Sequence, residues 1–238
     1  MNLREILADP SGGLVYHWRA LRYRNTLWTV FRAHVERWIS GWHPEREHLL
    51  IVGPSAGHTL PEGLSTRFAS TTVMEPDPLA RWLLRRSPEG QRMHLADPVE
   101  LQHPEGVRTL ARTYPEHAIL FSNVLGQLIA PAPWTWSQIL AETLSGHHWA
   151  SFHDVFSSVD APNARSMRDR DVGIAFDTRP DKNRLLARFW AGPRVTVTDH
   201  ETFGLGDTDA PHEYALWSLT PRHWQLIEWT AHAPAEHP

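Results

Sequence analysis

Residues 48–57 read HLLIVGPSAG, an apolar run that ends in a turn with two glycines and a serine. The run 48–52 lacks alternation between polar and apolar residues, which is typical of a strand buried on both faces of a parallel sheet. The turn has two interpretations. As Gly53-x-Ser55-x-Gly57 it matches the nucleophile elbow of serine hydrolases. As a glycine turn it could instead bring its backbone close to a nucleotide-like ligand.

The remainder of the chain predicts more strands alternating with helices. This alternation indicates an α/β fold with a mostly parallel sheet and helices on both faces. Strands are expected at 70–74, 91–96, 117–121, 149–152 and 194–198, helices at 79–86, 107–114, 136–144 and 183–190, and a C-terminal hairpin at 214–219 and 223–229. The polar segment 157–181 is expected to be a mobile loop or lid.

Residues 14–42 have helical periodicity with a stripe of tryptophans, which predicts one long or broken amphipathic helix. We expect residues 1–44 to form a helical extension and residues 45–238 the main domain. The stripe must be covered, so most of it is expected in the core. As a hypothesis, the helix covers the ligand cleft and brings Tyr16, Tyr23 or Arg24 to the substrate side.

Composition and charge exclude several classes of function. The chain has 238 residues, a net charge of −4 and no cysteine, so disulfides, thiolate zinc sites and a cysteine nucleophile are excluded. The acidic balance does not favour a nucleic-acid partner. The charged first residues differ from a signal peptide, and no apolar run is long enough for a membrane helix. We therefore expect a cytoplasmic protein with no membrane partner.

The hydrolase interpretation of Ser55 fits the flanking sequence poorly. An elbow follows strands that build the sheet, yet most of the 47 residues before the first expected strand are predicted helical. The helix should start at the serine, yet Pro61 comes soon after it. The aspartates and histidines that follow in the required order are common enough to occur by chance.

The ligand-binding interpretation finds matching residues downstream. Glu75 follows Gly53 by 22 residues, at the end of the second expected strand, where a carboxylate can accept hydrogen bonds from ribose hydroxyls. Asp97 ends the third expected strand. Ligands of open parallel sheets bind beyond the carboxyl ends of the strands, where all these residues are expected.

In order, the segments LLIVGPSAG, VMEPDPLA, HLADP and ILFSNVLGQL resemble the motifs of class I S-adenosylmethionine-dependent methyltransferases, and LLARFWAGPRVTV resembles the helix, turn and penultimate strand of that fold. The resemblance covers residues 48 to about 230. It implies a Rossmann-like sheet of seven strands, S-adenosylmethionine as cofactor, and methyl transfer as the activity. In this resemblance Gly53, Ser55 and Gly57 face the methionine part, Glu75 the ribose and Asp97 the adenine, while Ser122 and Asn123 border the sulfonium and the substrate.

Two departures from the family pattern leave an alternative open. The turn has Ser55 where the family usually has a glycine, and Ile51 stands where it usually has a carboxylate that holds the cofactor's ammonium. A binding or scaffold protein that keeps the fold without activity is therefore the alternative. The chain also lacks the Asn/Asp-Pro-Pro-Tyr motif of nucleic-acid amino methyltransferases, which favours a small molecule or a protein side chain as acceptor.

Histidines near the fifth strand raise the question of a metal. His147 and His153 would lie about 20 Å apart along a strand at ~3.3 Å per residue, and His148 and His153 would point to opposite faces, so no metal site is expected. His153 and Asp154, at the strand end, are the candidate catalytic residues, since methyl transfer to oxygen or nitrogen often requires removal of a proton. The sequence indicates no oligomeric state.

Overall fold

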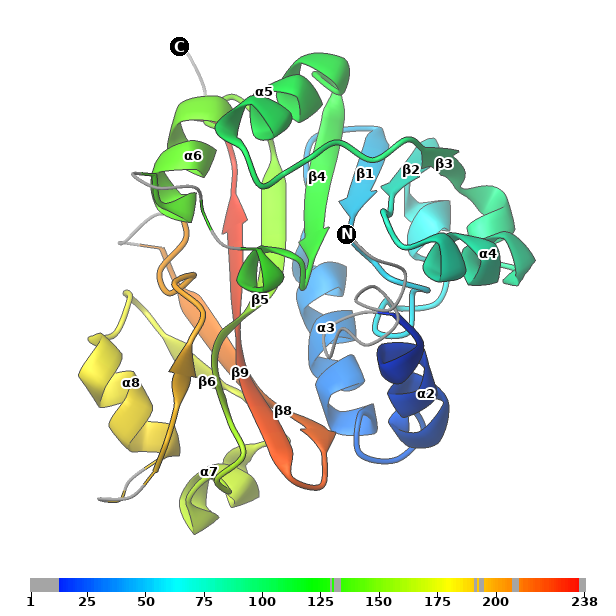
Figure 1. Cartoon of the computed structure of the whole chain (residues 1–238). Helices are drawn as coiled ribbons and strands as arrows, with labels where there is room; N and C mark the ends of the chain where they lie inside the picture. The colour runs from blue at the N-terminus through cyan, green and yellow to red at the C-terminus, as the bar shows by residue number, and fades with distance from the viewer. Residues whose placement is uncertain are drawn as a thin grey trace.

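The computed structural model describes residues 13–128, 130, 134–190, 192, 195–206 and 210–235. Figure 1 shows a central sheet with helices on both sides. The helices are α2 (Gly13–Tyr23), α3 (Thr29–Gly41), α4 (Pro78–Arg86), α5 (Pro104–Thr113), α6 (Trp136–Thr143), α7 (Ala164–Asp169) and α8 (Lys182–Phe189), with the short 3-10 helices η1 (Leu64–Arg67), η2 (Gly90–Arg92) and η3 (Leu125–Gln127). The strands are β1 (His48–Val52), β2 (Ser70–Met74), β3 (His94–Ala96), β4 (His117–Ser122), β5 (Trp149–Ser158), β6 (Ile174–Phe176), β7 (Thr198–Asp199), β8 (His212–Thr220) and β9 (His223–His232).

The sheet has the order β3-β2-β1-β4-β5-β9-β8-β6 within the described residues, and the short β7 pairs with β5. Strands β1 to β5 are parallel, whereas β9 runs antiparallel to both β5 and β8. Seven strands therefore form the main sheet, with the short β6 and β7 added to it. The predicted Rossmann-like α/β fold with an antiparallel C-terminal hairpin is confirmed.

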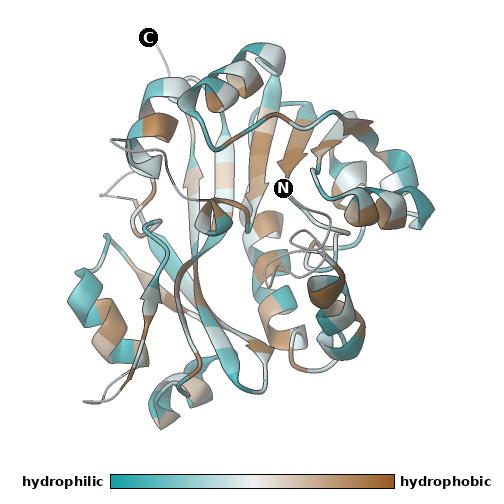
Figure 2. Cartoon of the chain, viewed as in Figure 1, coloured by the Kyte–Doolittle hydropathy of each residue, from teal (hydrophilic) through white to brown (hydrophobic). Residues whose placement is uncertain are grey.

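Strand β1 shows why the apolar run had no alternation. Leu49 and Ile51 pack with α3 in one core cluster, while Leu50 and Val52 pack with α5 and α6 in the cluster on the other face. A strand covered by helices on both faces buries every side chain, so period-2 polarity disappears. Figure 2 shows the same pattern as a hydrophobic band through the central strands.

The N-terminal segment folds as two helices rather than one. Helices α2 and α3 pack on the same face as α4, and Trp28, Phe31 and Trp38 are buried there. The indole Nε1 of Trp28 donates to Leu219 O at 3.1 Å, and the ring of Phe31 stacks on Trp217 with centroids 4.4 Å apart. The tryptophan stripe is thus mostly core, as expected, although Trp18 is 58% exposed.

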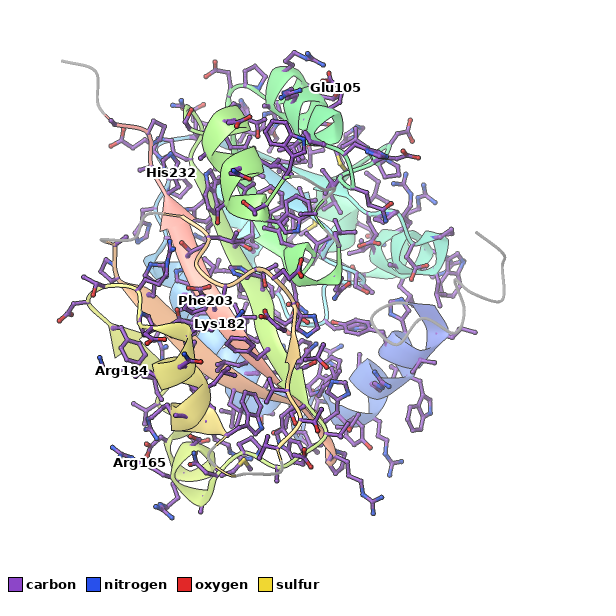
Figure 3. All side chains as sticks on the ribbon, turned by 60° about the vertical axis from the view of Figure 1, so that its left-hand side comes forward. Glu105, Arg165, Lys182, Arg184, Phe203 and His232 are labelled. Atoms are coloured by element: carbon purple, nitrogen blue, oxygen red, sulfur yellow. The ribbon has the colours of Figure 1, made fainter. Side chains whose placement is uncertain are left out.

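A third core cluster forms where α8 packs against β5, β8 and β9. Phe203 stacks on Phe156 of β5, and Lys182 Nζ lies 5.6 Å from the centre of the Phe156 ring. Figure 3 shows Lys182 and Phe203 close together over this part of the sheet. This contact attaches the loop that carries Phe203 to the part of β5 that extends past its pairing with β4.

Two sequence expectations about secondary structure are wrong. Segment 157–181 contains α7 and β6 rather than only a loop, because Asn163 caps α7 and β6 pairs with β8. The expected strand at 194–198 is reduced to β7 in the part that the structure describes. Residues 195–197 are held by side chains instead: the Ser158 hydroxyl donates to Thr196 O, and the Thr196 N–H donates to Asp160. The penultimate strand is therefore β8, not the segment inferred from the resemblance.

Strand ends also shift. The third strand begins at His94 because residues 90–92 form η2, and the fifth extends to Ser158 because it pairs with β9 along its length. No helix within the described residues is long and apolar enough to cross a membrane.

Candidate functional site

The turn after β1 has the conformation that its glycines allow. Gly53, Ser55 and Gly57 have φ values of 66°, 54° and 72°, in the left-handed region that favours glycine. A Cβ on Gly53 would lie 2.7 Å from Cβ of Val124, in the loop after β4. The loops after β1 and β4 therefore approach each other closely where the strand order reverses, which is the position at which open α/β sheets bind ligands.

The turn does not lead into a helix. The connection from β1 to β2 contains only η1 in addition to irregular backbone. A nucleophile elbow needs a helix that starts at the serine. Among the described residues the Ser55 hydroxyl has no hydrogen bond to a histidine. The hydrolase interpretation therefore gains nothing from the local geometry.

Glu75 joins the turn to the end of β2. Its Oε2 accepts the Ser55 N–H at 2.7 Å, and its Oε1 accepts the Asp77 N–H at 2.9 Å. The carboxyl is buried, and this burial raises its pKa to about 7, although the two N–H groups act in the opposite direction. A carboxylate has about four lone-pair sites, so Glu75 can still accept bonds from a ligand.

Asp97 lies one strand further out, directly after β3, and its side chain is exposed. The ends of β2 and β3 are joined by Arg81, which donates to Glu75 O at 3.2 Å and to Ala96 O at 2.6 Å. The structure therefore aligns the backbone before Asp97 with Glu75. It shows no contact between the two carboxylates.

Ser122 and Asn123 lie where β4 ends. Ser122 is buried, and Asn123 has a φ of 53°. The Asn123 N–H donates to Phe152 O at 2.8 Å, while its side-chain oxygen accepts the Asp154 N–H at 3.1 Å. An asparagine tolerates the left-handed conformation, and here it connects the end of β4 to the middle of β5.

A cavity of about 280 Å³ opens beyond the end of β4, beside the second half of β5. Its lining includes Tyr16 from α2, Asn123, Asp154, His200 and Gln225 from β9. Oδ2 of Asp154 accepts the Gln225 amide at 2.8 Å and lies 3.5 Å from His200 Nε2, which is also 2.9 Å from the Ser157 hydroxyl. Residues far apart in the sequence therefore form one polar site.

Two acceptor atoms of residues that line this cavity lack donors among the described residues. Asp154 Oδ1 and Gln225 Oε1 are buried and have no partner within the described residues. Gly126 leaves room for Asp154, because a Cβ there would overlap Oδ1. Burial raises the pKa of the Asp154 carboxyl, and the nearby His200 acts in the opposite direction. Buried polar atoms are usually hydrogen-bonded, so these two acceptors indicate a ligand with O–H or N–H groups.

His153 points away from this cavity. Its Nδ1 lies 3.0 Å from the Ser151 hydroxyl, and its Nε2 lies 3.4 Å from Glu228 Oε2 in a fully buried cluster. Glu228 also accepts hydrogen bonds from His212, Tyr214 and the Gly204 N–H. The two candidate catalytic residues are adjacent in a strand and so project to opposite faces of the sheet.

Helix α2 brings side chains to the carboxyl ends of the strands. Tyr16 lines the cavity, and its pKa is raised by burial and by the nearby Glu75. His17 Nε2 lies 3.4 Å from Asp77 Oδ2, and this contact lowers the pKa of Asp77. His17 and His200 were not among the sequence candidates, because neither lies in a motif.

No group of three His, Asp or Glu side chains in the described part of the chain could hold a metal ion.

The sequence matches no known family model and no curated protein. Among solved structures, a chain from the complex between the Haloferax volcanii Trm112 methyltransferase activator and a methyltransferase gives a TM-score of 0.43 at 8% identity, with 100% of each chain covered. An uncharacterized protein from Listeria monocytogenes serotype 4b gives 0.41 at 11%, covering 86% of this chain and 68% of that one. The plantazolicin methyltransferase BamL, in complex with SAH and a substrate analog, gives 0.37 at 11%, covering 58% and 50%.

The fold is defined by its own strand order, with five parallel strands in the order 3-2-1-4-5 and β9 inserted antiparallel between β5 and β8. This strand order agrees with the Rossmann-like sheet of seven strands that the sequence resemblance implies.

Proposed function

We propose that this chain transfers a methyl group from S-adenosylmethionine to a small acceptor that carries a hydroxyl or amine. The observation that carries the proposal is the buried Glu75 carboxylate, hydrogen-bonded to the turn after β1 at the switch point of the sheet. A ribose bound at this edge of the sheet would need an acidic acceptor at the end of β2, which supports the proposal.

The residues present fit most of the cofactor. Glu75 would accept the ribose hydroxyls, Asp97 would lie at the adenine edge, and the turn of Gly53, Ser55 and Gly57 would border the methionine part. Ser122 and Asn123 would border the reacting groups. Ile51 is buried in the core, so the cofactor's ammonium would need a partner outside β1. When bound, the cofactor supplies a methyl group activated by a sulfonium.

The chain's own contribution would be to orient the acceptor and to take its proton. The acceptor's O–H or N–H would donate to Asp154 Oδ1, the buried oxygen without a donor. Asp154, supported by the imidazole of His200, would accept the proton as the methyl group arrives. His153 would keep the buried Glu228 cluster in place and would not contact the acceptor.

The first test is calorimetric titration with S-adenosylhomocysteine. We expect micromolar binding by the wild type and at least tenfold weaker binding by Glu75→Gln, a loss of about 1.4 kcal/mol. Affinity should also fall as the pH drops below about 7, because ribose hydroxyls donate best to an ionised Glu75. Glu62→Gln removes the same charge from an exposed position in the β1–β2 connection and should bind normally.

If neither protein binds S-adenosylhomocysteine, the proposal is wrong. The alternative, a binding protein that retains the fold without the activity, would then be preferred. Binding without turnover on any hydroxyl or amine acceptor would also favour that alternative.

A second test concerns proton removal. On an acceptor that gives turnover, Asp154→Asn should lower kcat/KM by about 10²-fold or more and leave S-adenosylhomocysteine affinity unchanged. Wild-type activity should rise with pH as Asp154 ionises, because the base must be unprotonated. His200→Gln should show a smaller loss. An Asp154→Asn variant that is fully active, with an unchanged pH profile, would remove Asp154 from the mechanism.

A further inference from the structure

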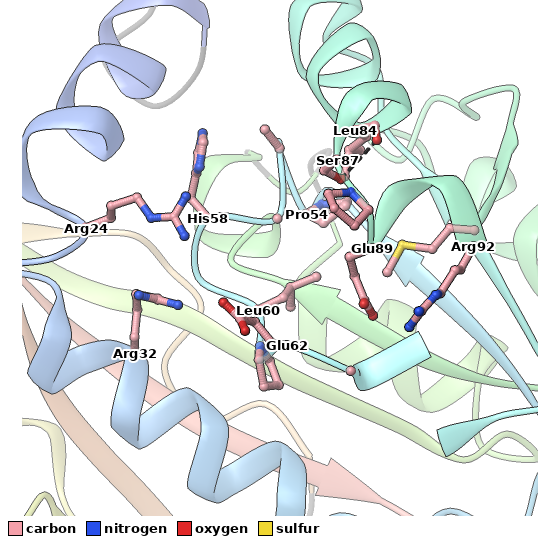
Figure 4. A pocket seen from close by; sticks show the side chains of 16 residues that line it. Arg24, Arg32, Pro54, His58, Leu60, Glu62, Leu84, Ser87, Glu89 and Arg92 are labelled. Carbon is pink, nitrogen blue, oxygen red and sulfur yellow. Dashed lines mark hydrogen bonds between the residues drawn. The ribbon is translucent and has the colours of Figure 1, made fainter. Parts of the chain in front are cut away.

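A second and larger cavity, of about 530 Å³, lies between helices α2 and α3, the connection after β1, and the segment from α4 to η2. Figure 4 shows Arg24 and Arg32 reaching into it from two different helical segments. It shares no lining residue with the cavity at Asp154. Nothing in the proposed methyl transfer uses these two arginines.

The two guanidinium groups lack partners. The Nε atoms of both Arg24 and Arg32 are buried and have no hydrogen-bond acceptor within the described residues. None of the ion pairs among the described residues includes Arg24 or Arg32. A buried donor without an acceptor is unfavourable, and more so when the group is charged. Two such donors facing one cavity indicate that an anion belongs there.

The other polar groups around the cavity do not neutralise this charge. Burial lowers the pKa of His58 to about 4, and the charges of His17, Arg24 and Arg32 act in the same direction, so the ring is neutral at neutral pH. Glu89 accepts the Ser65 N–H at 2.9 Å and lies beside Arg92. Glu62, which also lines the cavity, is exposed and forms no ion pair within the described residues.

The remaining wall is apolar. Leu60, Leu84 and Met93 line the cavity together with Pro54. Ligand pockets typically enclose roughly 300–1,000 Å³ and combine an apolar lining with a few polar groups that orient the ligand. A volume of about 530 Å³ is larger than an inorganic anion needs.

We propose that this cavity binds a small organic anion, with its phosphate or carboxylate between Arg24 and Arg32 and its apolar body against Leu60, Leu84 and Met93. Guanidinium groups bind both anions in bidentate geometry. Arg24 and Arg32 are not part of the proposed cofactor site, although Gly57 of the turn also lines this cavity. Binding of the anion does not depend on methyl transfer.

The test is calorimetric titration of the full chain, without cofactor, using phenyl phosphate and benzoate as probes. Binding of at least one is expected, and Arg24→Gln and Arg32→Gln should each weaken it at least tenfold. Benzyl alcohol, which has the ring without the charge, should not bind. Inorganic phosphate, which has a charge without the ring, should bind more weakly than phenyl phosphate.

The matched control is Arg85→Gln, which removes the same charge from an exposed position of α4 outside the lining. It should bind both probes as the wild type does. Both cavity arginines are partly exposed and make no hydrogen bond within the described residues, so these variants are expected to fold, as circular dichroism would verify.

Three results would overturn the proposal. The first is the absence of binding for both anions at millimolar concentrations. The second is an equal loss in Arg85→Gln, which would indicate only a general charge effect. The third is competition by saturating S-adenosylhomocysteine, which would place the cavity within the cofactor site. Failure of the methyl-transfer proposal alone would leave anion binding intact.

Discussion

At the scale of single residues, Glu75 connects the turn to the sheet through two backbone N–H groups rather than through a charged partner. This is why burial dominates its ionisation. The pKa of Glu75 rises from its ordinary value near 4.5 to about 7. Compared with the unfolded chain, the folded chain therefore favours the neutral acid over the carboxylate.

This raised pKa predicts a pH dependence of stability. The folded state holds the proton more tightly than the unfolded chain, so the contribution of Glu75 is fully present below pH 4.5 and is lost as the pH rises through about 7. The loss is on the order of 3 kcal/mol. Glu75→Gln cannot titrate, so the free energy of unfolding of the wild type minus that of the variant should fall across this window and stay constant above it. Urea unfolding at several pH values measures this difference, and a constant difference across the window would contradict the pKa.

The other residues of the site depend on contacts that no motif contains. His200 reaches Asp154 from the loop after β7, and Gln225 reaches it from β9. Asp154 could be inferred because it follows an apolar run. Its partners could not, because they are tens of residues away in the sequence and no local pattern shows that they meet Asp154.

At the scale of elements, helices α2 and α3 contain tryptophans in very different environments. Trp28 is fully buried against Trp217, with ring centroids 5.0 Å apart, whereas Trp18 is exposed on the outer face of α2. The helical period alone would place several of these rings on one stripe. The break between the two helices decides which of them meet the sheet.

This difference predicts opposite results for the same substitution. Trp28→Ala should lower the free energy of unfolding by about 3–5 kcal/mol, because it leaves a large core cavity and removes a hydrogen bond to Leu219 O. Trp18→Ala should change it by less than ~0.5 kcal/mol. Urea denaturation of the two variants measures both values. Similar losses for the two would mean that α2 packs against the chain through Trp18 as well.

At the scale of the whole molecule, the N-terminal helices share a core cluster with the sheet. Phe31, Val35 and Trp38 pack together with Ile51, Trp217 and Ile227. The expected division at residue 44 therefore marks an extension in sequence, while the apolar contacts join both parts. Small domains with a common core unfold cooperatively.

We predict a single unfolding transition in urea. Tryptophan fluorescence, to which Trp18, Trp28, Trp38 and Trp42 of the N-terminal segment contribute, should coincide with far-ultraviolet circular dichroism, which reports on the whole chain. The physical reason is that exposing the α3 face uncovers one side of β1 and β8 at the same time. A fluorescence transition at lower urea than the circular dichroism transition would instead show that the helices detach first.

The sequence by itself determined the strands β1, β2 and β4, the helices between them, and the placing of Glu75 at a strand end. These follow from local apolar runs, glycines and caps, which act over a few residues. The tertiary structure alone decided that Asp154 meets His200 while His153 faces Glu228, that residues 195–197 are not a strand, and that Arg24 and Arg32 share a cavity. Those outcomes depend on strand pairing, on β-bulges and on contacts between segments that are distant in the sequence. Such contacts contribute free energy only after the folding chain has brought the segments together.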